Sequence, residues 1–273
     1  MGSSLSSCSS SSSCSSLEDT MNSKIFYPPS LSYDIKKLNS KSCTMLSTQT
    51  LSKQTVHLAH IIPNNNNKTQ KYIIMSSGNG ADVFGMIDYG QYLANNLNVS
   101  VILYDYLGYG HSTGSPSETG CYESISAVIS YVKNELHVLE KDITLIGQSL
   151  GTGITIDYVS KNNWKSPIIL ISPYKSIISV VYDSSIVQLA NPIDKFKTLS
   201  KLGNVFCPVK IFHGDADELI NVSHGKTIYE KLNNKTFEPT WLKGVGHNDI
   251  LGVIDLKEVE KVVRYESATQ LYE

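Results

Sequence analysis

One stretch of the sequence, residues 143–151, decides the fold that we expect for this chain and has the sequence ITLIGQSLG. Its first four residues are apolar or β-branched, as in a buried strand, and the residues after Ser149 have the apolar spacing of a helix. Ser149 therefore falls on a sharp turn between strand and helix, which the small residues Gly147 and Gly151 allow to close. Because a helix N-terminus favours developing negative charge, Ser149 is a candidate nucleophile; the alternative is a serine that only caps the helix.

Segments on both sides of this stretch alternate between strand and helix patterns. Such alternation predicts an α/β fold with a mostly parallel central sheet and helices on both faces. We expect parallel strands at 72–75, 100–104, 143–146, 167–171, 209–212 and 240–242, and helices at 86–97, 122–136, 150–160, 225–232 and 256–267. Two earlier segments, 43–48 and 54–62, have the alternation of antiparallel edge strands.

A serine hydroxyl becomes a good nucleophile when a base removes its proton and an acid orients that base. Both groups follow Ser149 in the sequence, each just after a predicted strand. His247 is the candidate base, because it is the histidine in a glycine-flanked loop after the last strand. Asp217 is the favoured acid, since it lies far enough beyond its strand to turn back toward that loop. Asp215, which we expect to bond to the backbone of its own turn, remains the alternative.

A glycine-rich loop, SSGNGAD at residues 76–82, follows the first parallel strand and permits close approach of its backbone. We expect the backbone amides of Asn79 and Leu150 to form an oxyanion hole there, with Asp82 capping the next helix.

Three further expectations concern structural residues. Asp249 caps the final helix, His213 is a hydrogen-bonded core residue, and His224 lies in a loop or at the surface.

The composition limits the classes of partner and compartment. The chain has 273 residues, 41% of them hydrophobic, and a net charge of −2, which argues against a nucleic-acid partner. Its five cysteines form neither a CxxC pair nor a metal-ligand spacing, so we expect no metal and, for serine chemistry, no cofactor. There is no apolar run of transmembrane length and no secretory signal pattern, so we expect a cytoplasmic protein.

The N-terminal residues 1–22 are rich in serine and are expected to form a disordered tail before a single domain at 23–273. Gly2 begins a pattern for N-myristoylation, and Cys8 and Cys14 follow as candidates for palmitoylation. Because one myristoyl chain binds membranes only marginally, stable peripheral attachment requires the second acyl chain. The alternative is an unmodified tail or a leader sequence.

Several motifs between Phe26 and about Asp249 resemble those of one family. They are Tyr27-Pro28-Pro29, Gly78-Asn79, Tyr104-Asp105-Tyr106, Gly108-Tyr109-Gly110, Ser112-Thr113-Gly114, Gly147-Gln148-Ser149, Ser223-His224-Gly225 and Gly246-His247-Asn248-Asp249-Ile250. The family is the α/β-hydrolase-domain-17 depalmitoylases, within the wider Bem46-like group. Two features depart from it: Ser77 replaces the usual histidine, and the tail has two cysteines instead of a cysteine cluster.

The resemblance implies an α/β-hydrolase fold and hydrolysis of palmitoyl thioesters on protein cysteines at the cytoplasmic membrane face. Ser149, Asp217 and His247 match the family's nucleophile, acid and base. The expected partners are S-acylated proteins or lipid esters. Two alternatives remain: a lipase or esterase for monoacylglycerol, lysophospholipid or small esters, and a catalytically silent scaffold, against which the intact catalytic residues argue.

The segment between Pro173 and Pro208 is too short for a large cap domain but long enough for a short lid. Its apolar side chains are expected either to receive an acyl chain or simply to cover the sheet. They are Ile177, Ile178, Val180, Val181, Ile186, Val187 and Leu189.

Overall fold

The computed structural model describes residues 20, 22–65, 69–181 and 194–266. Gly2, Cys8 and Cys14 lie outside the described residues, as do Ile186, Val187 and Leu189 of the predicted lid. The boundary between tail and domain therefore stays a prediction.

The described part of the chain forms one eight-stranded mixed sheet in the order β1-β2-β4-β3-β5-β6-β7-β8. The strands are β1 (Cys43–Gln49), β2 (Thr55–Ile61), β3 (Tyr72–Ser76), β4 (Ser100–Tyr104), β5 (Ile143–Gln148), β6 (Ile168–Ile171), β7 (Val209–Gly214) and β8 (Thr240–Leu242). Strand β2 is antiparallel to both β1 and β4, whereas the strands from β4 through β3, β5, β6 and β7 to β8 are parallel to one another. The predicted mostly parallel sheet with an antiparallel edge is confirmed.

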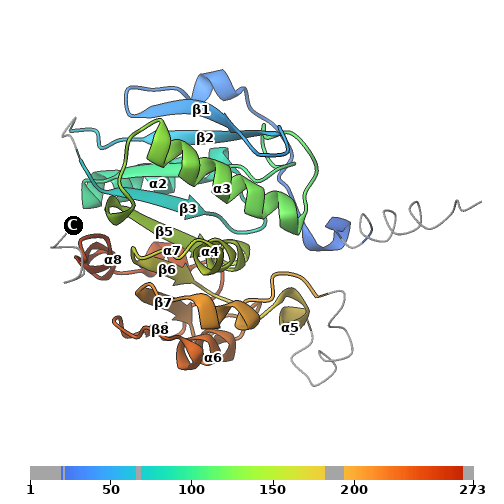
Figure 1. Cartoon of the computed structure of the whole chain (residues 1–273), viewed down its shortest axis with the longest axis vertical. Coiled ribbons are helices and arrows are strands. Elements are labelled where there is room, and N and C mark those ends of the chain that lie inside the picture. The colour runs from blue at the N-terminus through green and yellow to red at the C-terminus, as the bar shows by residue number, and fades with distance from the viewer. Residues whose placement is uncertain (1–19, 21, 66–68, 182–193, 267–273) are drawn as a thin grey trace, which may run out of the picture.

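Helices cover both faces of this sheet (Figure 1). They are α2 (Val83–Leu97), α3 (Glu118–Asn134), α4 (Leu150–Lys161), α5 (Ile177–Val181), α6 (Val222–Lys231), α7 (Ile250–Val253) and α8 (Leu256–Val263), with short 3₁₀ turns η1 (Ile35–Leu38), η2 (Glu140–Asp142) and η4 (Leu199–Asn204). Helices α2 and α3 begin earlier than their apolar spacing predicts. Asp82 and Ser117 cap them by accepting hydrogen bonds from the amides of Gly85 and Gly120, so the first turns are set by polar caps.

The C-terminal helical region differs from the prediction. Asp255 caps the last helix, α8, by accepting a hydrogen bond from the amide of Lys257. Asp249 instead precedes the separate one-turn helix α7 and makes no side-chain cap bond there. The prediction that Asp249 caps the final helix is wrong, because that helix begins at Leu256, directly after Asp255, and the extended Ile254 separates it from α7.

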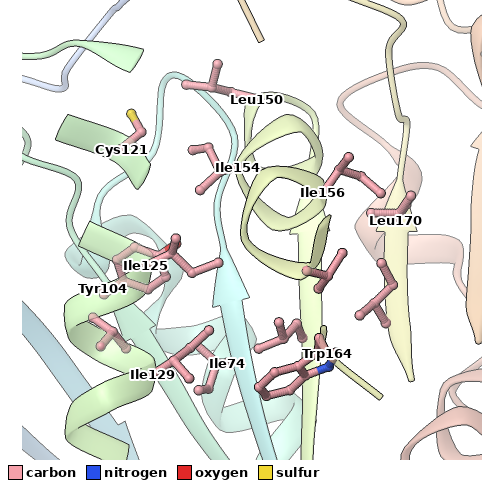
Figure 2. Packing of buried hydrophobic residues seen from close by; sticks show 14 of the residues in the cluster. Ile74, Tyr104, Cys121, Ile125, Ile129, Leu150, Ile154, Ile156, Trp164 and Leu170 are labelled. Carbon is pink, nitrogen blue, oxygen red and sulfur yellow. The ribbon is translucent and has the colours of Figure 1, made fainter. Parts of the chain in front are cut away.

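Buried side chains form two clusters, one on each face of the sheet, because successive strand residues point to opposite faces. On β3, Ile74 joins the cluster with α3 and α4, whereas Ile73 and Met75 join the cluster with α2 and α8. Figure 2 shows the first cluster, with Ile125 of α3 and Ile154 of α4 facing the sheet. Each such buried aliphatic side chain stabilises the fold by about 1.5–3 kcal/mol.

The described residues between β6 and β7 include only α5 and the 3₁₀ turn η4 as helical elements. Ile177 and Val180 of α5 pack against the cluster that contains α3 and α4. These two side chains therefore cover the core, in keeping with the simpler of the two roles expected for the lid.

Candidate active site

Ser149 occupies a strained turn between β5 and α4. Its φ and ψ are 49° and −118°, a left-handed φ that costs a non-glycine residue about 1–3 kcal/mol. The turn needs glycine on both sides: a Cβ at Gly147 would lie 2.6 Å from the carbonyl oxygen of Gly151, and one at Gly151 only 2.0 Å from that of Ser76. The amide of Ser149 donates to the carbonyl of Ile171 at 2.9 Å, which ties the turn to the neighbouring strand.

The structure brings Ser149, His247 and Asp217 together at the carboxyl edge of the sheet. Nε2 of His247 lies 3.1 Å from Oγ of Ser149, and Nδ1 lies 2.8 Å from Oδ2 of Asp217. The sequence separations are 98 residues from Ser149 to His247 and 30 from Asp217 to His247. All three side chains are buried. Such a hydrogen-bonded series allows a histidine to take a proton from a serine hydroxyl.

The environment of Asp217 holds its carboxyl group in the ionised form. Its Oδ1 accepts hydrogen bonds from the amides of Leu219 at 3.0 Å and Ile220 at 2.7 Å. Burial by itself raises the pKa of Asp217, but hydrogen bonds from His213, His247 and the Ile220 amide outweigh it, so the pKa lies well below its usual value. The carboxylate is thus able to accept a hydrogen bond from Nδ1 of His247, which leaves Nε2 facing Ser149.

Asp215, the alternative acid, has a different partner. Its Oδ1 accepts a hydrogen bond from the amide of Gly244 at 2.6 Å, in the loop that leads to His247. Asp215 therefore connects two loops of the site. The sequence predicts a different bond, to the backbone of its own turn. Its contact is with the backbone next to the site, not with the His247 ring.

Two other histidines near the site are buried. His213 is a hydrogen-bonded core residue, as predicted: its Nε2 lies 2.7 Å from the carbonyl oxygen of Ile220 and 3.5 Å from Oδ2 of Asp217. His224, expected in a loop or at the surface, is only 2% exposed, and its Nδ1 accepts a hydrogen bond from the amide of Lys175 at 3.3 Å. That expectation is wrong because α6 begins at Val222, before His224, and turns its side chain inward.

Residues 76–82, here called the oxyanion loop, lie against the nucleophile. A Cβ at Gly78 would stand 3.7 Å from Cβ of Ser149. Leu150 is the first residue of α4. Among the residues that the structure describes, the amides of Asn79 and Leu150 donate no hydrogen bond to a protein acceptor, so both are free to bind an oxyanion.

The side chain of Asn79 has a role that the sequence did not reveal. Its Nδ2 donates to the carbonyl of Ile25 at 2.6 Å, and its Oδ1 accepts from the amide of Tyr27 at 3.1 Å and from the Tyr109 hydroxyl at 2.6 Å. The N-terminal segment is thereby fixed to the oxyanion loop. The motifs around Tyr27 and Asn79 lie 52 residues apart, and nothing in their spacing indicates this contact.

In the described ranges, no three His, Cys, Asp or Glu side chains are grouped in a way that would hold a metal ion. The cysteines with described positions, Cys43, Cys121 and Cys207, are free and buried. Every helix in this part of the chain is too short or too polar to cross a bilayer.

Comparison with known proteins identifies related sequences. A family model described as the α/β hydrolase fold matches residues 78–180. An α/β hydrolase of Acanthamoeba polyphaga mimivirus is 46% identical over 253 residues, which cover 92% of this chain and 95% of that protein. The α/β-hydrolase domain-containing protein 17C of Homo sapiens is 35% identical over 178 residues, or 65% of this chain and 53% of that protein. The chain thus matches about half the length of the 17C relatives.

Solved structures with similar folds include an esterase of Pyrococcus furiosus, with a TM-score of 0.69 and 17% identity over 88% of this chain and 98% of that one. A serine hydrolase without lid from Xanthomonas campestris has a TM-score of 0.57 and 18% identity, covering 83% of this chain and 95% of the other. At these identities the similarity concerns the fold alone.

Proposed function

The chain belongs to the α/β-hydrolase family, and from this premise we propose that it is a serine hydrolase that cleaves fatty acyl thioesters. Its proposed substrate is palmitoyl-cysteine on membrane-associated proteins. The observation that carries the proposal is the hydrogen-bonded series from Asp217 through His247 to Ser149, with separations of 2.8 Å and 3.1 Å. The identity with the 17C proteins supports the thioester substrate through the family resemblance.

In the first half of the reaction, Nε2 of His247 takes the proton of Ser149 as Oγ attacks the thioester carbonyl carbon. The carbonyl π electrons move to oxygen, and the amides of Leu150 and Asn79 bind that oxyanion. The oxyanion then collapses and the carbon–sulfur bond breaks. The cysteine thiolate leaves with the proton from His247, and the fatty acyl group remains as an ester on Ser149.

The second half repeats these steps with water as the nucleophile. His247 takes a proton from water while the water oxygen attacks the acyl carbon. The same two amides hold the second oxyanion, and Ser149 leaves with the proton from His247. The products are the fatty acid and the free enzyme. The depressed pKa of Asp217, whose hydrogen bonds outweigh the effect of burial, keeps a negative charge beside the imidazolium in both halves.

Attachment to the cytoplasmic membrane face is part of the proposal, through acylation of Gly2 and of Cys8 or Cys14. The contacts of Asn79 with Ile25 and Tyr27 support it, because they place the start of the domain beside the oxyanion loop. A lipidated tail leaving from there would keep Ser149 near membrane-bound substrates and raise their local concentration.

The test compares hydrolysis of a palmitoyl-cysteine peptide and of a monoacylglycerol by the wild type, Ser149→Ala and Ser160→Ala. Ser160 is the matched control, since its hydroxyl bonds to the carbonyl of Asp157 at the far end of α4. We expect Ser149→Ala to abolish thioester hydrolysis and Ser160→Ala to retain it. Faster turnover of the monoacylglycerol would make the protein a lipase, and failure of the wild type to react with a fluorophosphonate probe would remove the enzyme proposal.

A further inference from the structure

Strands β3 and β4 lie side by side and parallel, with Met75 opposite Leu103, so the segments after them meet at the carboxyl edge of the sheet. The segment from the end of β4 carries three tyrosines, at 104, 106 and 109. Each of their hydroxyl groups makes a hydrogen bond of 2.6 Å to a residue of the oxyanion loop. The partners are Oγ of Ser76 for Tyr104, the carbonyl oxygen of Ser77 for Tyr106, and Oδ1 of Asn79 for Tyr109.

We propose that Tyr104, Tyr106 and Tyr109 are positioning residues that hold the oxyanion loop in its catalytic geometry. This inference rests on the proposed function, because it assigns the loop's free amide to the reaction. A hydrogen-bond donor stabilises a transition state best when it is fixed before the charge develops. The three hydroxyl groups supply that fixation from outside the loop.

The tyrosines are well suited to this role because they are rigid. Their exposed fractions are 2%, 1% and 0% in sequence order. Their rings pack edge to face, with centroids 5.5 Å apart for Tyr104 and Tyr106 and 5.4 Å apart for Tyr106 and Tyr109. Burial raises the pKa of each hydroxyl group well above its ordinary value, so all three stay neutral and keep their protons over the physiological range.

Two of these bonds hold the residues on either side of Gly78, next to the amide of Asn79. Tyr106 holds the carbonyl of Ser77, two residues before that amide, and Tyr109 holds the Asn79 side chain itself. Between them lies Gly78, whose missing Cβ would stand 3.7 Å from Cβ of Ser149. Loss of the Tyr106 hydroxyl frees the Ser77 end of this short segment and leaves a buried carbonyl unpaired. Loss of the Tyr109 hydroxyl removes one of the three hydrogen bonds that fix the Asn79 side chain.

The experiment uses Tyr106→Phe and Tyr109→Phe, which remove one oxygen and retain the packed rings. Tyr229→Phe is the control, because its hydroxyl bonds to Glu238 at 3.0 Å on an exposed surface. Turnover of a soluble p-nitrophenyl ester is measured per Ser149 titrated with a fluorophosphonate, and amide hydrogen exchange is followed for residues 76–82. We expect kcat per titrated site to fall about tenfold in the first two variants, with KM within twofold of wild type. We also expect faster exchange in the loop, and neither change in Tyr229→Phe.

Unchanged kcat per titrated site in both variants would overturn the positioning role, even if the melting temperature falls. The exchange measurement keeps this outcome separate from failure of the proposed function. If the wild type neither turns over the ester nor reacts with the fluorophosphonate, the enzyme proposal fails. In that case amide hydrogen exchange of the oxyanion loop alone tests the positioning role. Unchanged exchange in both variants would mean that the tyrosine hydroxyl groups do not hold the loop.

Discussion

The side-chain amide of Asn79 donates a hydrogen bond of 2.6 Å to the carbonyl oxygen of Ile25, 54 positions earlier in the chain. A second bond joins Oδ1 of Asn79 to the amide of Tyr27 at 3.1 Å. Between these contacts, Phe26 is 4% exposed and packs edge-on against Phe196 with a centroid distance of 6.1 Å. The N-terminal segment is therefore packed against the candidate active site, so its removal should affect both stability and activity.

Deletion of residues 1–27 should lower both the melting temperature and kcat on a soluble ester, whereas deletion of residues 1–19 should change neither. The longer deletion removes Phe26 from the core, which costs about 3–5 kcal/mol for a phenylalanine, and it also removes both backbone partners of Asn79. Thermal unfolding and steady-state kinetics on the two truncated proteins check this. Equal behaviour of the two would mean that the segment contributes nothing to the site.

Asp217→Asn should lower kcat by about 10³–10⁴-fold, whereas Asp215→Asn should lower it less than about tenfold. In Asp217→Asn the side-chain oxygen is retained by the amides of Leu219 and Ile220, so the new NH₂ group faces Nδ1 of His247 and favours the wrong tautomer. The Asp215 carboxylate accepts a hydrogen bond from the Gly244 amide next to the site. The measurement is kcat on a soluble ester, and a larger loss in Asp215→Asn would reverse the assignment of the acid.

Gly151→Ala should destabilise the protein by more than about 3 kcal/mol, because the added methyl group overlaps a backbone atom that is fixed in the sheet. Its Cβ would stand 2.0 Å from the carbonyl oxygen of Ser76 on β3. Gly203→Ala is the matched control, since a Cβ there meets nothing within 4 Å. Urea denaturation gives both free energies of unfolding. A Gly151→Ala protein as stable as the control would contradict the close approach of α4 and β3.

Asp105 makes the stability of the fold depend on pH. Burial, with a smaller effect from Asp82, raises its pKa to about 7, against the lowering effect of hydrogen bonds from the amides of Val83 and His111. The folded carboxyl therefore binds a proton that the unfolded chain, with a pKa of about 4, releases. This contribution to stability is complete below about pH 4 and is lost as the pH rises through about 7.

Between pH 5 and 8 the wild type should lose about 2–3 kcal/mol of unfolding free energy through this group. In Asp105→Asn the side chain at position 105 is neutral at every pH, so this variant should lose correspondingly less unfolding free energy between pH 5 and 8. Asp88→Asn, which alters an exposed carboxylate on α2, serves as the control and should follow the wild type. Urea denaturation at both pH values measures the difference. Parallel losses in all three proteins would show that Asp105 does not titrate in this range.

Much of the fold follows from local patterns that the sequence displays. The strand Ser100–Tyr104 and the strand Thr240–Leu242 have the predicted bounds, because buried strands are short apolar runs with sharp ends. Helix starts were less accurate where a polar cap precedes the apolar spacing, as at Asp82 and Ser117. The last helix begins at Leu256, as predicted, but the one-turn helix α7 (Ile250–Val253) has no counterpart in the prediction, because four residues are too few to show helical apolar spacing.

The sequence by itself determined the strand–turn–helix around Ser149, because that turn depends on residues close together in the chain, and it displays directly the order in which an acid and a histidine follow Ser149. Only the tertiary structure decided that Asp217, not Asp215, meets His247, that His224 is buried, and that Asn79 holds Ile25 and Tyr27. These contacts join segments that are distant in sequence, and Asn79, Asp217 and His247 come to the site because the parallel strands before them end at one edge of the sheet. Periodicity along the chain carries no information about which side chains become partners there.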